Sequence, residues 1–259
     1  MFSSKIQKLI DDESFDKALR TRLKEWAKQS PRFVQFVNQN KNKIYGRLNV
    51  NVPDEDKRDI GIELYIAFAF LQTNCHVIYE PKIPSISRKP DFKISFGDCS
   101  FYLEVKRLRK YKPKAEDISI NTKTGDKTFS IDNKAVFKKC GDVICEKISQ
   151  TVPKGVNVLY IRYSLTDVPN IWDLDKAIRN LIEWKDEDPQ KFTKKIKSNK
   201  IKSIAEFDRY WKQLSAIIIS RPTGHDPQIW ENPVALQPIN QIIKDKIRDA
   251  AKLPFRYDF

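Results

Sequence analysis

The clearest pattern along the chain is a change from helical to strand-like spacing near residue 75. Apolar residues between 54 and 74 recur at helical intervals, so this stretch is expected to form one long helix. Short runs rich in β-branched and aromatic residues follow it, at 75–80, 91–96 and 101–106. Gly97 and Asp98 separate the last two runs and are typical of a tight turn. The pattern predicts a helix followed by three strands, of which the last two form a hairpin.

A second helix and a buried strand are expected to complete this unit. Residues 132–150 have the pattern of a helix, which 153–155 (Pro-Lys-Gly) would end. Residues 156–163 form an apolar, β-branched run of the kind found in buried strands. The polar stretch 110–129 is long for a structureless connection, which usually marks a functional loop. The order helix, three strands, helix, strand (αβββαβ) predicts an α/β fold with a mixed central sheet flanked by helices.

The regions on either side of this unit are expected to be mainly helical. Residues 15–26 repeat apolar residues at helical spacing behind a candidate N-cap at Ser14, and Pro31 can open a further helix. Later helices are expected at 174–184, 204–214 and 240–252, with a strand-like run at 216–220 and a Pro/Gly-rich stretch at 221–233. The basic segment 194–202 is expected to be solvated surface or a contact for phosphates. These patterns divide the chain into a helical region (1–50), a core (51–165) and a mostly helical extension packed on the core (166–259).

The charge balance adds a class of partner. The chain has 48 Lys plus Arg against 34 Asp plus Glu, a net charge of +14. A surface this cationic attracts polyanions, of which nucleic acid is the commonest. The alternative is a lysine-rich surface that serves solubility alone.

Cysteine and histidine usage excludes several other classes. The four cysteines contain no CxxC pair, which argues against a zinc ribbon or a thioredoxin-like motif and favours free thiols in a reducing compartment. Only two histidines are present, which excludes His-rich zinc catalysis and leaves little scope for a Ser-His-Asp triad. No signal-like or membrane-spanning apolar run is found, so the protein is expected to be cytoplasmic and without a membrane partner.

The candidate chemistry lies on the expected hairpin. Residues two apart in a strand share a face, so Glu104 and Lys106 should project together, and the hairpin should bring the carboxylate of Asp91 beside that of Glu104. Two carboxylates this close must share a proton, gain a cation or bind a metal, and oxygen ligands suit Mg²⁺ or Mn²⁺. A lysine ammonium can then orient the attacking water or offset charge on a phosphate. Glu63, on the long helix, borders the buried face and needs a partner, for which a metal-bound water is one candidate.

With Pro90-Asp91 and Glu104-Val105-Lys106, residues 54–163 resemble the PD-(D/E)XK nuclease superfamily, which includes restriction endonucleases and Holliday-junction resolvases. The αβββαβ order is also the core of that superfamily, so a restriction-endonuclease-like core is expected. The resemblance implies that Asp91, Glu104 and the carbonyl of Val105 bind the metal. It implies that Lys106 serves the attacking water, and that Glu63 acts through water or a second metal. A Gln or Lys on the second helix of some members would correspond to Gln150 or Lys147.

Basic residues around the hairpin are the expected contacts for nucleic acid. They are Arg88, Lys89, Lys93, Arg107, Arg109 and Lys110, together with Gln150. A phosphate clamp leading out of the site is one interpretation, with Tyr111 able to stack on a base, and a solvated loop is the other.

The function expected from these observations is metal-dependent hydrolysis of phosphodiester bonds. Family resemblance implies a DNA endonuclease that uses Mg²⁺ or Mn²⁺ and leaves a 5′-phosphate. Since many members act as dimers, a homodimer is an expected assembly. The first alternative is a catalytically silent nucleic-acid-binding protein with the same fold, and the second is an interaction protein with no nucleic-acid role. For the carboxylates and Lys106 the alternative is a surface ladder of salt bridges, and for Glu63 it is an ion pair with a nearby lysine.

Overall fold

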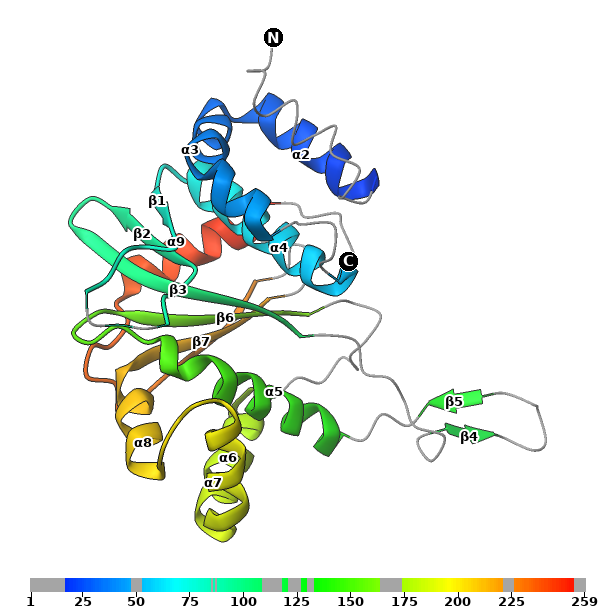
Figure 1. The fold of residues 1–259 in the computed structure, drawn as a ribbon, viewed down its shortest axis with the longest axis vertical. Coiled ribbons are helices and arrows are strands. Elements are labelled where there is room, and N and C mark those ends of the chain that lie inside the picture. The colour runs from blue at the N-terminus through cyan, green and yellow to red at the C-terminus, as the bar shows by residue number, and fades with distance from the viewer. Residues whose placement is uncertain are drawn as a thin grey trace.

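The structure, a computed structural model, describes residues 17–47, 53–84, 86, 88–108, 118–120, 127–129, 133–163, 174–220 and 226–253. Within these residues the central sheet has six strands: β1 (His76–Tyr79), β2 (Phe92–Phe96), β3 (Cys99–Leu108), β6 (Asn157–Tyr163), β7 (Leu214–Ser220) and β8 (Gln228–Glu231). A separate hairpin consists of β4 (Ile118–Ile120) and β5 (Lys127–Phe129). Figure 1 shows this hairpin projecting away from the main body.

Helices cover both faces of the sheet. The helices are α2 (Lys17–Gln29), α3 (Pro31–Arg47), α4 (Asp54–Gln72), α5 (Asn133–Lys147), α6 (Leu174–Glu187), α7 (Pro189–Ser198), α8 (Ile204–Gln213) and α9 (Gln241–Ala251), with a 3₁₀ turn, η2 (Ile148–Gln150), after α5. Figure 1 shows α2, α3, α4 and α9 on one side of the sheet and α5 to α8 on the other. In the described part of the chain no helix is long and apolar enough to cross a membrane.

The sheet is mixed, in the order β1-β2-β3-β6-β7-β8. Its two edges are antiparallel, through the β1–β2, β2–β3 and β7–β8 pairs. Its centre is parallel, through β3–β6 and β6–β7. Parallel neighbours need a crossover, and α5 supplies the first one while α6, α7 and α8 lie in the second. Because α5 joins β3 to β6, the end of α5 lies over the strand that carries Glu104.

Alternation along the central strands builds a core on each face. Val158, Tyr160 and Ile218 belong to the core that includes α4, whereas Leu159 and Ile217 belong to the core beneath α5 to α8. Both faces are apolar because both are covered, as expected for buried parallel strands. On β3 the apolar residues Phe101, Leu103 and Val105 join the α4 core. Glu104 and Lys106 are thereby directed toward α5, on the shared face that the sequence predicts.

The fold confirms the expected α/β class with a mixed central sheet flanked by helices. From α4 to β6 the order of elements is the expected one, except that the β4–β5 hairpin lies within the stretch expected to be a loop. In the segment after residue 165 the expected strand-like run at 216–220 belongs to β7, whereas β8, the other strand that this segment adds to the sheet, was not expected.

The basic segment 194–202 lies partly in α7, and four of its five lysines are exposed, as expected of solvated surface. Asp188 caps this helix by accepting a hydrogen bond from the Lys191 amide, and Pro189 occupies its first turn. Phe192 and Ile196 are fully buried and anchor it. These two apolar positions, four apart, were obscured in the sequence by the surrounding lysines.

Candidate active site

Asp91 and Glu104 lie side by side where β2 begins. The strands are antiparallel and Phe92 pairs with Leu103, so Asp91, just before Phe92, lies opposite Glu104, just after Leu103. The Asp91 amide donates to Glu104 Oε2 at 3.2 Å, and the Val105 amide donates to Asp91 Oδ2 at 2.8 Å. The hairpin thus brings the two predicted carboxylates together through backbone hydrogen bonds.

The protein interior opposes the charge of both carboxylates. Only 6% of Glu104 is exposed. Burial, followed by the negative charges of Glu104 and Glu63, raises the pKa of Asp91 well above its usual value, despite opposing effects of Lys147 and the Val105 amide. Burial also raises the pKa of Glu104, although Lys147 opposes the shift. Paired acids with raised pKa values are a common mark of functional sites.

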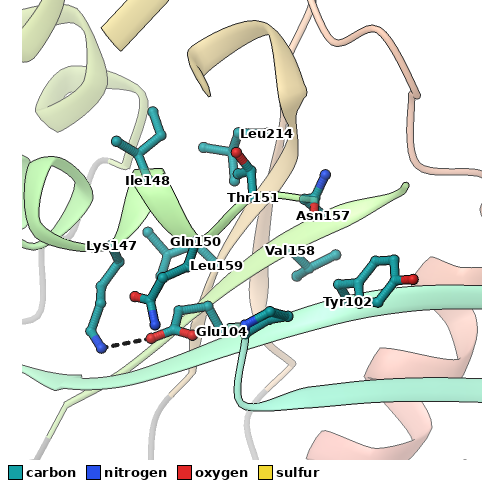
Figure 2. A pocket seen from close by; sticks show the side chains of 11 residues that line it. Tyr102, Glu104, Lys147, Ile148, Gln150, Thr151, Asn157, Val158, Leu159 and Leu214 are labelled. Atoms are coloured by element: carbon teal, nitrogen blue, oxygen red, sulfur yellow. Dashed lines mark ion pairs between the residues drawn. The ribbon is translucent and has the colours of Figure 1, made fainter. Parts of the chain in front are cut away.

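Lys147 is the cation at this pair. It is the last residue of α5, and its Nζ lies 2.6 Å from Glu104 Oε1, as Figure 2 shows. The described residues offer this buried oxygen no well-oriented hydrogen bond, so the charge of Lys147 is its main partner. Burial would lower the pKa of Lys147, but the charges of Glu104 and Asp91 outweigh it and raise the pKa above its usual value. Lys147 is therefore a permanent ammonium at neutral pH.

Lys106, the lysine of the predicted motif, is directed at a different acid. Its Nζ donates to Glu146 Oε1 at 2.9 Å, and its side chain is 18% exposed. Glu146 precedes Lys147 on α5 and is more open to solvent, with 44% of its side chain exposed. Two lysines thus border the site, with Lys147 bound to Glu104 and Lys106 held at its rim.

Glu63 has two protein partners. It is 4% exposed, and Tyr79 Oη donates to its Oε2 at 2.7 Å. Arg47 donates from Nη2 to Oε1 at 2.7 Å and from Nη1 to Oε2. The alternative of an ion pair is thus closer to the structure, with an arginine in place of a lysine. The sequence did not predict Arg47 as the partner. The only signal for it was that a buried glutamate needs a cation.

The expected nucleic-acid contacts separate into three groups. Arg107 is buried at 5% exposure, with its Nε 2.9 Å from Asp59 Oδ1 on α4, so its place inside the fold corrects the expectation of a surface contact. The physical reason is that β3 extends to Leu108, and strand alternation then directs residue 107 toward α4. Arg109 and Lys110, like Tyr111, lie outside the described residues.

The third group consists of two residues on the loop before β2, Arg88 and Lys89, with Gln150 of η2 and Lys93 of β2. Arg88 donates to Ser149 Oγ at 3.1 Å and to the Asn199 carbonyl at 3.2 Å. Gln150 Nε2 donates to the carbonyl of Lys89, whose side chain is exposed, at 3.0 Å. These bonds tie the loop that carries Asp91 to η2 and to the residue that follows α7. Lys93 lies with its Nζ 5.8 Å from the centre of the Tyr102 ring.

A small hollow lies beside Glu104 on the α5 face (Figure 2). Its polar lining includes Glu104, Lys147, Gln150, Thr151 and Asn157. Its volume of about 20 Å³ is enough for one water molecule.

The donor set of Asp91 and Glu104 suits a hard cation with limited protein ligation. Among the described residues no group of three or more His, Cys, Asp or Glu is placed to hold a metal ion. Magnesium, however, is often bound by one or two carboxylates and keeps several waters. Asp91 fits that pattern. Glu104 is also engaged, since its Oε2 accepts the Asp91 amide and its Oε1 pairs with Lys147, so it would bind the ion in exchange for the Lys147 ammonium. Glu63 is held more firmly, by two guanidinium nitrogens of Arg47 and by the Tyr79 hydroxyl. At Val105 the contact seen is its amide, which orients Asp91.

Comparisons with known proteins give no relative. No protein-family model matches the chain, and no match was found among curated proteins or solved structures. The resemblance to PD-(D/E)XK nucleases therefore stays a prediction, supported by the motif residues and the order of elements.

Proposed function

We propose that this chain is a metal-dependent nuclease of the PD-(D/E)XK type that hydrolyses phosphodiester bonds, with DNA as its substrate. The observation that carries the proposal is the pair formed by Asp91 and Glu104, which two hydrogen bonds hold together and whose pKa values burial raises. Such a pair costs folding free energy unless a cation relieves it. A catalytic role would explain why the fold retains this carboxylate pair where β2 adjoins β3.

Asp91 and Glu104 would hold one divalent cation, Mg²⁺ or Mn²⁺. When bound, such an ion lowers the pKa of a coordinated water and polarises the phosphoryl oxygen. The Val105 amide keeps Asp91 oriented, since its hydrogen bond occupies Oδ2 and leaves Oδ1 for a ligand. Gln150 and Arg88 hold the preceding loop in place through their bonds to the Lys89 and Asn199 carbonyls.

The two lysines would act as cations toward the phosphate. Lys147 remains protonated because its pKa is raised, so it stabilises negative charge and does not act as a general base. Lys106 lies two residues after Glu104 on β3 and shares its face. It could contact a phosphate if its ion pair with the partly exposed Glu146 breaks. Both assignments keep the chemistry on the α5 face of β3.

The test is a cleavage assay on purified full-length protein. Plasmid, single-stranded DNA and RNA are incubated with Mg²⁺, with Mn²⁺ or with EDTA, using wild type, Asp91→Ala and Glu104→Ala. Asp98→Ala is the control, since Asp98 is an exposed acid in the β2–β3 turn. We expect metal-dependent cutting of DNA by wild type and the control only. Cutting that persists in Asp91→Ala and Glu104→Ala would remove the assignment.

A catalytically silent nucleic-acid-binding protein is the second candidate. The observation that favours it is that Glu104 and Glu63 already have cationic partners, Lys147 and Arg47, as a purely structural pair would. This candidate predicts DNA binding without cutting, and no change in melting temperature on addition of Mg²⁺. The nuclease proposal predicts cutting and stabilisation by the cation.

A further inference from the structure

Arg47 connects the N-terminal helices to the candidate active site. It ends α3, Glu63 lies on α4, and Tyr79 ends β1. Arg47 and Tyr79 together donate to both carboxylate oxygens of Glu63. The site is therefore bordered by an element outside the stretch that carries the motif.

Glu63 affects the Asp91–Glu104 pair electrostatically, but its oxygens are bonded to Arg47 and Tyr79. Its negative charge contributes to the raised pKa values of both Asp91 and Glu104. Glu63 is held by a bidentate guanidinium and a tyrosine hydroxyl, whereas Glu104 has one ammonium and one backbone amide as partners, so Glu63 has the smaller capacity left for a metal. To bind a cation, Glu63 would have to break its bidentate ion pair with Arg47. The half-buried guanidinium would then have no carboxylate partner, which costs free energy.

The position of Arg47 is itself fixed by its surroundings. Lys43, one turn earlier on α3, donates to the Tyr79 carbonyl at 2.8 Å and to the Glu80 carbonyl at 3.2 Å. Phe36 and Ile44 on the same helix are buried. Burial would lower the pKa of Arg47, but the hydrogen bonds and charge of Glu63 raise it above its usual value. Arg47 is therefore a fixed positive charge held against Glu63.

We propose that Arg47 is a positioning residue that withholds Glu63 from the metal, so that this centre binds one divalent cation, at Asp91 and Glu104, rather than two. The inference rests on the proposed function, because it takes the cation to be a ligand of that pair. It departs from the sequence expectation, in which Glu63 serves through water or a second metal.

The experiment is isothermal titration of the full-length protein with MnCl₂. Wild type is compared with Asp91→Asn, Arg47→Met and the double variant Arg47→Met/Glu63→Gln. The double variant removes one positive and one negative charge, so the net charge near the site is unchanged. It also leaves no unpaired ion, and the amide oxygen introduced by Glu63→Gln can still accept the hydrogen bond from Tyr79. Circular dichroism checks that each variant is folded.

We expect wild type to bind one Mn²⁺ and the double variant to match its affinity within about twofold. Asp91→Asn should bind at least about tenfold more weakly. In Arg47→Met, Glu63 is released, and we expect a second ion or about tenfold tighter binding. Should Arg47→Met fail to fold, the double variant decides alone.

Two different failures can be told apart. If wild type binds Mn²⁺ and the double variant loses about tenfold or more in affinity, Glu63 is a ligand and the inference about Arg47 is overturned. Two ions in wild type, or a folded Arg47→Met that binds like wild type, would also overturn it. If wild type binds no Mn²⁺ at all, the proposed metal-dependent function fails together with the inference.

Discussion

Asp91 is held in a place where its own charge is disfavoured. Burial and the neighbouring carboxylates raise its pKa, so the folded chain binds a proton more tightly at this position than the unfolded chain does. Stability from this group is therefore present at pH values below its ordinary pKa and is lost as the pH rises through the raised one. At neutral pH the ionised form of Asp91 lowers the free energy of unfolding unless a cation is bound.

Asp91→Asn is consequently expected to stabilise the protein at neutral pH. The asparagine oxygen can still accept the Val105 amide hydrogen bond, and the repulsion with Glu104 is removed. A gain of about 1 kcal/mol corresponds to a rise in melting temperature of about 2–4 °C for a chain of this size. Thermal denaturation from pH 4 to pH 8 checks this, and the gain should shrink toward acidic pH. A lower melting temperature at neutral pH would contradict it, and Asp98→Asn serves as the control.

The two lysines should differ in their effect on cleavage. Lys147 contacts Glu104, whereas Lys106 contacts the more exposed Glu146. We expect Lys147→Gln to slow single-turnover cleavage by about 100-fold or more and Lys106→Gln by less than about tenfold. The matched substitution removes one ammonium in each case and keeps a polar side chain. The opposite order would return the catalytic role to Lys106.

The sequence predicted the contact that depends on local geometry. Asp91 and Glu104 are joined by a short hairpin, so strand alternation and turn residues were enough to bring them together. The Arg47–Glu63 pair depends on how α3 packs on α4 and β1, which no spacing rule specifies. Lys147 was identified only loosely, because the direction of a side chain at the end of a helix depends on how that helix crosses the sheet.

At the scale of elements, the turn before β6 is fastened by one side chain. The two hydrogens of Asn157 Nδ2 are shared among the carbonyls of Val152, Gly155 and Gln213, which lie 2.8–2.9 Å from the nitrogen, and Oδ1 accepts from the Val152 amide at 2.8 Å. The residue is buried, at 4% exposure. This side chain sets where β6 begins beside β3, and it also lines the hollow next to Glu104.

Asn157→Ala should therefore destabilise the protein by about 2–3 kcal/mol, because it leaves several buried backbone groups without partners. Urea denaturation monitored by circular dichroism measures this change. Gln72→Ala, at an exposed position on α4, is the control and should change stability by less than about 0.5 kcal/mol. Equal stability of the two variants would show that the turn is fixed by the backbone alone.

Elements with a strong internal pattern were predictable, and elements defined by their neighbours were not. The long α4 and the apolar β6 have repeating patterns that composition and spacing reveal. By contrast, β8 is short, lies within the Pro/Gly-rich stretch and alternates poorly, so only its pairing with β7 identifies it as a strand. Likewise, β4 and β5 each have three residues and gain their identity from pairing with each other.

At the scale of the whole molecule, the net charge of +14 should govern binding to nucleic acid. Lysine and arginine contacts to phosphates release counterions, so affinity falls as salt rises. Binding of the full-length Asp91→Asn variant to a labelled duplex in EDTA measures this without cutting. We expect affinity to fall at least about tenfold between 50 and 200 mM KCl. Affinity that is independent of salt would contradict both nucleic-acid functions.

The whole fold also changes the status of the flanking regions. The N-terminal helices supply Arg47 to the site, and the C-terminal part supplies β7 and β8 to the central sheet. Sequence divisions at 50 and 165 therefore separate segments that share one sheet or one site. The Arg47–Glu63 ion pair connects the N-terminal flank to the candidate site.

The most direct test of the central claim compares wild type with Asp91→Asn in cleavage of a labelled DNA duplex, with Mg²⁺ or with EDTA. The substitution removes one charge, retains the hydrogen bond to the Val105 amide and is expected to raise stability. We predict that wild type cuts only with Mg²⁺ and that Asp91→Asn cuts at least about 100-fold more slowly. Cleavage by folded Asp91→Asn at the wild-type rate, or equal cleavage by wild type in EDTA, would contradict the account.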